Sequence, residues 1–281
     1  MPQPTDPVKK KAESGPPGSL RGRILAFVSG RRRTPVDILN QLFREMPVSR
    51  GSVQAAIREL VADGELAYAH EHGRTFLEPS FDRAVRVSRR IVLAPPGREV
   101  SSKTDDCVIR IRPGVSFGVG RHPTTRLALQ AIEAALDGLS TDADIPMGNV
   151  LDIGTGSGVL AVAAVKLGLA GGIGLDIDPC AVAEARENVR LNGLEGRIEV
   201  SDKAVEGIDR RFTLVAANLR LPTLVALAPR IDLFTEAKAA VVVSGIRTEE
   251  ISAIESALEK SFMLEWSAAE EDWAGIVMRK K

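Results

Sequence analysis

The stretch VLDIGTGSG, from Val150 to Gly158, constrains the fold of this chain more than any other part of its sequence. An apolar run ends beside Asp152 and is followed by glycines at alternate positions, Gly154, Gly156 and Gly158. This pattern is typical of a strand that turns directly into a helix, because glycine tolerates positive φ angles and close approach of another group to the backbone. We therefore predict a strand–loop–helix unit whose bare loop backbone faces a ligand.

The sequence around this unit alternates strand patterns with helical patterns. Strands are predicted at residues 150–153, 172–176, 198–201, 214–218, 239–244, 262–266 and 273–278. Helical patterns separate the first six strands, which favours an α/β fold with a parallel sheet covered on both faces. The last two strands are too close for a crossover helix, so they should form a hairpin. The prediction is a Rossmann-like, seven-stranded sheet of the class I methyltransferase type.

The glycine loop and two acids distinguish between two cofactors. A dinucleotide-binding loop reads G-x-G-x-x-G, whereas the spacing here is G-x-G-x-G, with Asp152 just before it and Asp176 at the end of the next strand. S-adenosylmethionine carries a sulfonium and an ammonium, which suit an acid and bare carbonyls, and its ribose hydroxyls suit a second acid. The motif therefore predicts S-adenosylmethionine, bound by Asp152, Asp176 and the three glycines, and not a nicotinamide.

Composition excludes several other classes of protein. The chain has 281 residues, 44% of them hydrophobic, and we expect no membrane span and no secretory signal. Cys107 and Cys180 lie far apart in the sequence, which indicates reduced thiols and a cytoplasmic location. His70 and His72 have no cysteine at ligand spacing, so no metal site is predicted.

The N-terminal part has a different organisation. Residues 1–18 are rich in Pro, Lys, Ser and Gly and should be disordered. Residues 19–82 carry three helical patterns, with Thr34 capping the second and Ser49 opening the third, and then a short hairpin. This order resembles a winged helix-turn-helix domain, and we expect residues 83–110 to be a linker with strands that lead into the catalytic domain.

The charge of the chain is divided between its two parts. Residues 1–103 carry 18 Lys and Arg against 11 Asp and Glu, whereas residues 104–281 carry 19 against 26. In the winged-helix-like domain, Arg50 and Arg58 on the third helix and Arg74 in the hairpin are candidate contacts to a nucleic acid or to another partner. The pattern leaves open whether this domain binds nucleic acid or docks a protein.

The flanks of the glycine loop extend the resemblance to a known family. The stretches RPGVSFGVGRHPTTRLAL, VLDIGTGSGVLAVAAVKLG, GIGLDIDPCAVAEARENVRLNG, VAANL and VVVSGI are similar to the PrmA family, which methylates amines of ribosomal protein eleven of the large subunit. The similarity runs from about Ile111 to Arg279, and residues 111–281 would form the S-adenosylmethionine-dependent methyltransferase domain. It implies that Thr125, Gly154, Asp176 and Asn218 contact the cofactor, and that Asn218 orients the acceptor amine.

The chain also departs from the pattern of that family. Val119 and Arg121 replace two threonines, and Arg220 stands where a small or apolar residue is usual. The winged-helix-like domain takes the place of the ferredoxin-like substrate-binding domain. We therefore expect a methyltransferase that acts on a lysine or N-terminal amine of a protein of the translation machinery, such as a ribosomal protein. The alternatives are a methyltransferase directed to RNA, DNA or a nucleic-acid-bound protein, and a non-catalytic DNA-binding regulator that senses the cofactor.

Overall fold

The computed structural model describes residues 18–29, 31–71, 73–112, 114, 117–118, 120, 122–140 and 148–281. Residues 1–17 of the tail that we expect to be disordered lie outside the described residues. Val119 and Arg121 lie outside them as well. The described chain divides into two compact units, which meet in sequence between Ser80 and Phe81. In the part of the chain that is described, no helix is both long enough and apolar enough to cross a membrane.

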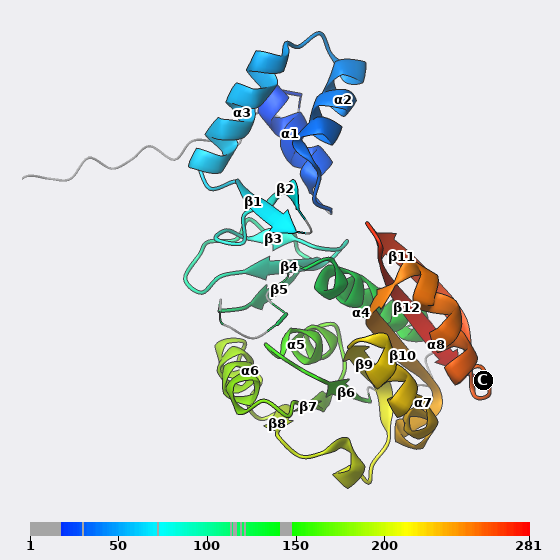
Figure 1. Cartoon of the computed structure of the whole chain (residues 1–281). Helices are drawn as coiled ribbons and strands as arrows, with labels where there is room; N and C mark the ends of the chain where they lie inside the picture. Colours follow the sequence, from blue (N-terminus) through cyan, green and yellow to red (C-terminus); the bar gives the residue numbers. More distant parts are fainter. Residues whose placement is uncertain are drawn as a thin grey trace, which may run out of the picture. The chain divides into compact units, whose positions relative to one another are not determined.

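The N-terminal unit contains three helices followed by a hairpin, in the predicted order (Figure 1). Its elements are α1 (Leu20–Val28), α2 (Pro35–Glu45), α3 (Arg50–Ala62), β1 (Leu66–Glu71) and β2 (Arg74–Pro79). Thr34 and Ser49 each form a capping box at the start of α2 and α3, as predicted for helix starts at these residues. The helices bury a small core of their own that includes Ile24, Leu42 and Leu60.

The segment between α1 and α2 adds a third strand-like contact to the hairpin. Arg33 and Leu77 exchange two backbone hydrogen bonds, of 2.9 and 2.7 Å. This bridge ties the loop after α1 to β2. The assignment of the unit as a winged helix stays a prediction.

The second unit is built on a seven-stranded sheet. Its strands are β6 (Asn149–Ile153), β7 (Gly171–Leu175), β8 (Ile198–Ser201), β9 (Phe212–Asn218), β10 (Thr235–Arg247), β11 (Phe262–Glu270) and β12 (Trp273–Lys280). All seven overlap the predicted strands. They lie in the order β11-β12-β10-β9-β6-β7-β8, and β12 is antiparallel to both of its neighbours. The predicted class I methyltransferase sheet is confirmed, and its antiparallel strand lies second from the edge.

Helices cover both faces of this sheet (Figure 1). The covering helices are α4 (Pro123–Ser140), α5 (Val159–Lys166), α6 (Pro179–Leu191), α7 (Leu221–Phe234) and α8 (Ile251–Leu258). Alternate residues of β6 point to opposite faces, so that Val150 joins the core with α4, α5 and α6, whereas Leu151 joins the core with α7 and α8. The central strands are therefore buried on both sides, which explains their continuous apolar runs.

A small three-stranded sheet precedes the large one. Its strands are β3 (Val85–Arg86), β4 (Ile91–Ala94) and β5 (Cys107–Arg110), in the order β3-β4-β5. Ile91 and Ile109 are fully buried and share their core with α4 and α5. These strands therefore pack as part of the second unit.

Candidate functional site

The glycine loop connects β6 to α5 and contacts the backbone at Phe117. The Ser157 amide donates a hydrogen bond of 2.8 Å to the Phe117 carbonyl. Gly156 has a φ of 53°, and a Cβ added to it would lie 2.5 Å from the same carbonyl oxygen. Only glycine fits at this position without moving the backbone. The local sequence thus brings residues before α4 onto the carboxyl end of β6.

Asp176 follows β7 and holds the loop from the other side. Its Oδ2 atom accepts a hydrogen bond of 2.9 Å from the Gly156 amide, and its Oδ1 atom accepts one of 3.0 Å from the Asp178 amide. A carboxylate has about four lone-pair positions, so two bonds leave capacity for further donors. The side chain lines a cavity of about 550 Å³ at the carboxyl ends of β6, β7 and β9. This is the position where ligands bind in open parallel sheets.

Asp152 lies beneath the loop and does not line that cavity. It is fully buried, and its Oδ2 atom accepts hydrogen bonds from the Thr155 hydroxyl at 2.6 Å and from the Ala161 amide at 3.2 Å. Burial raises the pKa of this carboxyl from 3.8 to about 6, although the bond from Thr155 opposes the shift. Its position indicates that Asp152 shapes the loop. Its predicted contact to the cofactor stays a prediction.

The other predicted residues fall into two groups. Gly154, Gly156, Asp176 and Asn218 line the 550 Å³ cavity. Gly158 and Thr125 do not: Gly158 is the N-terminal cap of α5, and Thr125 lies in the first turn of α4. The Thr125 side chain is 1% exposed. The structure thus brings four of the predicted cofactor residues to one cavity. Asp152, Gly158 and Thr125 lie outside its lining.

A second, smaller cavity of about 300 Å³ adjoins the first. Phe117, Asn218 and Leu219 line both cavities. Asn218 is the last residue of β9, which places its side chain at the carboxyl edge of the sheet, where the two cavities meet. The two cavities therefore share Asn218 as part of their lining.

Aromatic rings from two segments, the one before α4 and the start of β12, form the wall of the smaller cavity. The ring centroids of Phe117 and His122 are 5.1 Å apart, and those of His122 and Trp273 are 5.0 Å apart. The Thr124 hydroxyl lies 2.8 Å from Nδ1 of His122, and the guanidinium carbon of Arg247 lies 3.9 Å from the centre of the Trp273 ring. Sequence reasoning missed this wall. The HPTT segment could have indicated His122 and Thr124, but no local signal marks Trp273, at the start of β12.

The side chains that line the larger cavity fit S-adenosylmethionine. Asp176 offers unused acceptor positions for ribose hydroxyls, and Ile177 and Leu227 offer apolar surface for an adenine ring. Two buried hydroxyls, that of Ser157 in the loop and that of Thr125 in the first turn of α4, have no hydrogen-bond partner in the described part of the chain. Buried polar groups ordinarily have one, but neither of these residues lines the cavity.

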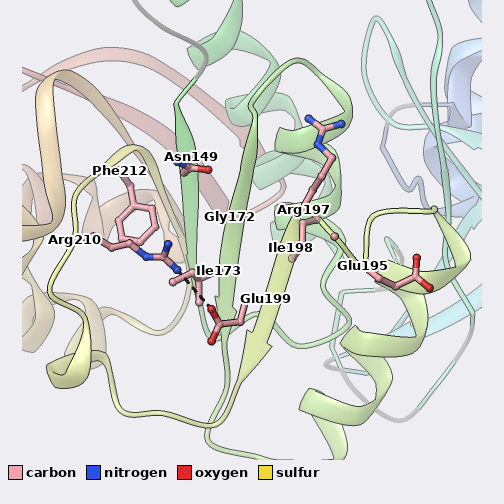
Figure 2. Close-up of a pocket in the computed structure, with 10 residues that line it drawn as sticks. Asn149, Gly172, Ile173, Glu195, Arg197, Ile198, Glu199, Arg210 and Phe212 are labelled. Atoms are coloured by element: carbon pink, nitrogen blue, oxygen red, sulfur yellow. Dashed lines mark hydrogen bonds and ion pairs between the residues drawn. The ribbon is translucent and has the colours of Figure 1, made fainter.

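Another cavity, of about 350 Å³, lies at the amino ends of the parallel strands, opposite the two cavities at their carboxyl ends (Figure 2). Asn149, at the start of β6, is part of its lining. Arg210 is 3.5 Å from Glu199, and the Arg197 guanidinium donates to the backbone carbonyls of Leu169 and Ala170. None of the predicted site residues lines this cavity. Its cations are already engaged, so we do not assign it as the functional site.

The predicted partner contacts Arg50, Arg58 and Arg74 belong to the N-terminal unit, and all three are exposed. Arg50 and Arg58 lie two turns apart on one side of α3, with the exposed Gln54 between them. Several carboxylates of this unit face α1 instead. Glu59 and Asp63 pair with Arg21 at 3.4 and 2.5 Å, and Glu45 pairs with Arg23 at 3.1 Å.

Comparison with known proteins assigns the second unit to a family. Residues 79–281 match the family model described as ribosomal protein L11 methyltransferase (PrmA). A protein named ribosomal protein L11 methyltransferase from Pelobacter propionicus is 35% identical over 199 residues, which cover 70% of this chain and 63% of that protein. One of the same name from Geobacter metallireducens is 38% identical over 193 residues, which cover 68% of this chain and 61% of that protein.

A solved structure shows the same similarity in three dimensions. The crystal structure of a ribosomal protein L11 methylase from Lactobacillus delbrueckii subsp. bulgaricus superposes with a TM-score of 0.60 and 31% sequence identity. The match covers 71% of this chain and 99% of that chain. By contrast, the present chain spans less than two thirds of the length of the two relatives above. Residues 1–78 lie outside the family match.

Proposed function

The chain belongs to the ribosomal protein L11 methyltransferase (PrmA) family, and from this premise we propose that it transfers a methyl group from S-adenosylmethionine to an amine of a protein. The observation that carries this proposal is the meeting of two cavities at Asn218. The larger cavity has an acid with unused acceptor positions, Asp176, and the smaller one has an aromatic wall. A cofactor and an acceptor side chain can thus approach each other at one residue.

In this proposal, residues that follow β6 and β7 hold the cofactor. Asp176 accepts hydrogen bonds from the ribose hydroxyls, and the backbone at Gly154 and Gly156 lies against the amino-acid part. The cofactor supplies an electrophilic methyl group on a sulfonium. The protein contributes mainly position and exclusion of water, and this chemistry requires no metal.

The acceptor amine would enter the smaller cavity. A lysine amine has an ordinary pKa of about 10.4 and must lose its proton before its lone pair can attack. Neither Asp nor Glu lines this cavity among the described residues, so the cavity offers no carboxylate to stabilise an ammonium ion. Partial desolvation beside Phe117 and Trp273 favours the neutral amine further. Asn218 can orient that amine by accepting a hydrogen bond through its side-chain oxygen.

The names of the relatives suggest the acceptor protein. The two relatives described above are named for ribosomal protein L11, and we propose that protein, or a similar protein of the translation machinery, as the substrate. Such a substrate would place the reaction in the cytoplasm. Incubating the full chain with S-adenosylmethionine and purified L11 from the same organism should yield a methylated amine that mass spectrometry locates. L11 that stays unmodified would contradict this substrate.

A second candidate involves the N-terminal unit. We propose that residues 19–82 form a winged-helix domain, in which Arg50, Arg58 and Arg74 direct the enzyme to RNA, DNA or a protein bound to them. The exposure of these arginines supports this candidate, as does the engagement of Glu45, Glu59 and Asp63 with α1. The competing interpretation of the same unit is a module that docks the protein substrate directly.

A further inference from the structure

The smaller cavity is lined by one residue with a permanent charge, Arg220. Among the described residues that form its lining, none is Asp or Glu. Arg220 is exposed, and its guanidinium has no ion pair or hydrogen bond with the described part of the chain. It precedes α7, where its side chain makes no capping bond. The charge of Arg220 is therefore not used within the described structure.

The neighbouring arginines differ from Arg220 in this respect. Arg247 lies over the Trp273 ring, and its guanidinium is 3.8 Å from the Asp272 carboxylate. Arg126 is buried and donates a hydrogen bond of 3.1 Å to Glu270. Each of these cations has a carboxylate partner inside the protein. Arg220 has no carboxylate partner in the described part of the chain, so a molecule that occupies the cavity can supply one.

The backbone that carries Arg220 is held in place. The Leu219 amide donates a hydrogen bond of 3.1 Å to the carbonyl of Ser244, at the carboxyl part of β10. Gly245 packs so closely that an added Cβ would lie 2.5 Å from the Leu219 carbonyl oxygen. The root of the Arg220 side chain is thus fixed two residues after Asn218. A fixed backbone lowers the entropy lost when the guanidinium binds a partner.

We propose that Arg220 binds a carboxylate beside the acceptor amine, so that the enzyme prefers amines flanked by an acidic side chain. This inference rests on the proposed function, because it assigns the smaller cavity to the acceptor. A guanidinium can bind a carboxylate through two parallel hydrogen bonds, which fixes the orientation of the acceptor segment. The same positive charge disfavours a protonated amine nearby, so Arg220 would select for the neighbouring acid and for the reactive neutral amine together.

The test measures binding, so that it does not depend on turnover. The full chain is titrated with two capped dipeptides, N-acetyl-Lys-Glu-amide and N-acetyl-Lys-Gln-amide, with and without S-adenosylhomocysteine. The wild type should bind the Glu dipeptide about fivefold more tightly, a value kept small because the guanidinium is exposed. Arg220→Met should remove this preference, and Arg220→Lys should keep part of it. The control Arg190→Met removes an exposed arginine of α6 and should change nothing.

Three outcomes would overturn the proposal. One is equal binding of the two dipeptides by the wild type, and this includes failure to bind either. Another is a preference that persists in Arg220→Met. The third is seen when N-acetyl-lysine and N-acetyl-lysine amide are titrated in the same way. If the enzyme prefers only the free α-carboxylate of N-acetyl-lysine, Arg220 binds a chain terminus and not an acidic side chain. Absence of S-adenosylhomocysteine binding would instead contradict the cofactor site, while the dipeptide comparison without it still decides the role of Arg220.

Discussion

Asp176 is the residue on which the cofactor assignment depends most. Two backbone amides, those of Gly156 and Asp178, hold its carboxylate at the edge of the larger cavity. Asp176→Ala should weaken S-adenosylmethionine binding by about 2 to 4 kcal/mol, because the hydrogen bonds from the two ribose hydroxyls to the charged carboxylate are lost in part. Calorimetry measures this difference. Asp209→Ala removes an exposed acid outside the cavity and serves as the control, and unchanged affinity in a folded Asp176→Ala would contradict the assignment.

Asn218 should affect the reaction more than it affects cofactor binding. It lines both cavities, so its side chain can orient the acceptor amine at the point of transfer. We expect Asn218→Ala to lower kcat several-fold while the affinity for S-adenosylhomocysteine changes little. The wild-type rate should rise with pH as the amine loses its proton. A variant that loses affinity and keeps kcat would assign Asn218 to the cofactor alone.

Asp152 should make stability depend on pH in an unusual direction. Its pKa is raised by burial from 3.8 to about 6, so between these values the folded state binds more protons than the unfolded state. Stability contributed by this group is therefore present below about pH 4 and falls as pH rises toward 6, by about 3 kcal/mol in total. Urea unfolding of the wild type and of Asp152→Asn across this range isolates the effect. A difference between them that does not vary with pH would contradict it.

At the scale of single residues, the sequence predicted the acids and glycines of the larger cavity better than the aromatic wall of the smaller one. Asp176 and Gly156 lie within a motif whose spacing follows from local backbone geometry, so a linear pattern can reveal them. His122 and Trp273 come from distant segments that the sheet order brings together. Burial separates Asp152 from the cavity, although it stands next to the loop in sequence. No local pattern indicates which neighbour of a loop faces a ligand.

At the scale of elements, periodicity and capping residues predicted most of what forms. All seven strands of the large sheet overlap their predicted ranges. The central strands were predictable because they are buried on both faces and have continuous apolar runs, whereas β11 is largely exposed. Their ends were less predictable. The tenth strand runs from Thr235 to Arg247, beyond the predicted 239–244, because α7 passes directly into it and its last residues pair with β12.

The arginines of α3 and the hairpin allow a test of the nucleic-acid candidate. If Arg50, Arg58 and Arg74 contact phosphates, the affinity of the full chain for duplex DNA should fall steeply with salt, with a slope of about 0.9 per phosphate neutralised. Replacing all three by Ala should flatten that slope by up to about three units, since each residue is exposed and outside the core. A full chain without salt-dependent binding contradicts this candidate and leaves the protein-docking interpretation.

At the scale of the whole molecule, we expect the second unit to bind the cofactor and the N-terminal unit to deliver the substrate. All the predicted cofactor residues lie in the second unit, which is also the part that the family model matches. A fragment of residues 81–281 should therefore bind S-adenosylhomocysteine as tightly as the full chain does, but methylate a protein acceptor much more slowly. Calorimetry and rate measurements on both proteins check this division. Equal rates would show that the N-terminal unit does not deliver the substrate.

The claim that this protein methylates a protein amine is tested most directly by following the methyl group. The full chain is incubated with methyl-labelled S-adenosylmethionine and a lysate of its own organism, with and without nuclease, and Asn218→Ala serves as the matched control. We expect the label in protein, where it resists nuclease and is recovered as a methylated amine after hydrolysis, and we expect less of it with the variant. Label that migrates with RNA or DNA and disappears on nuclease treatment would contradict it.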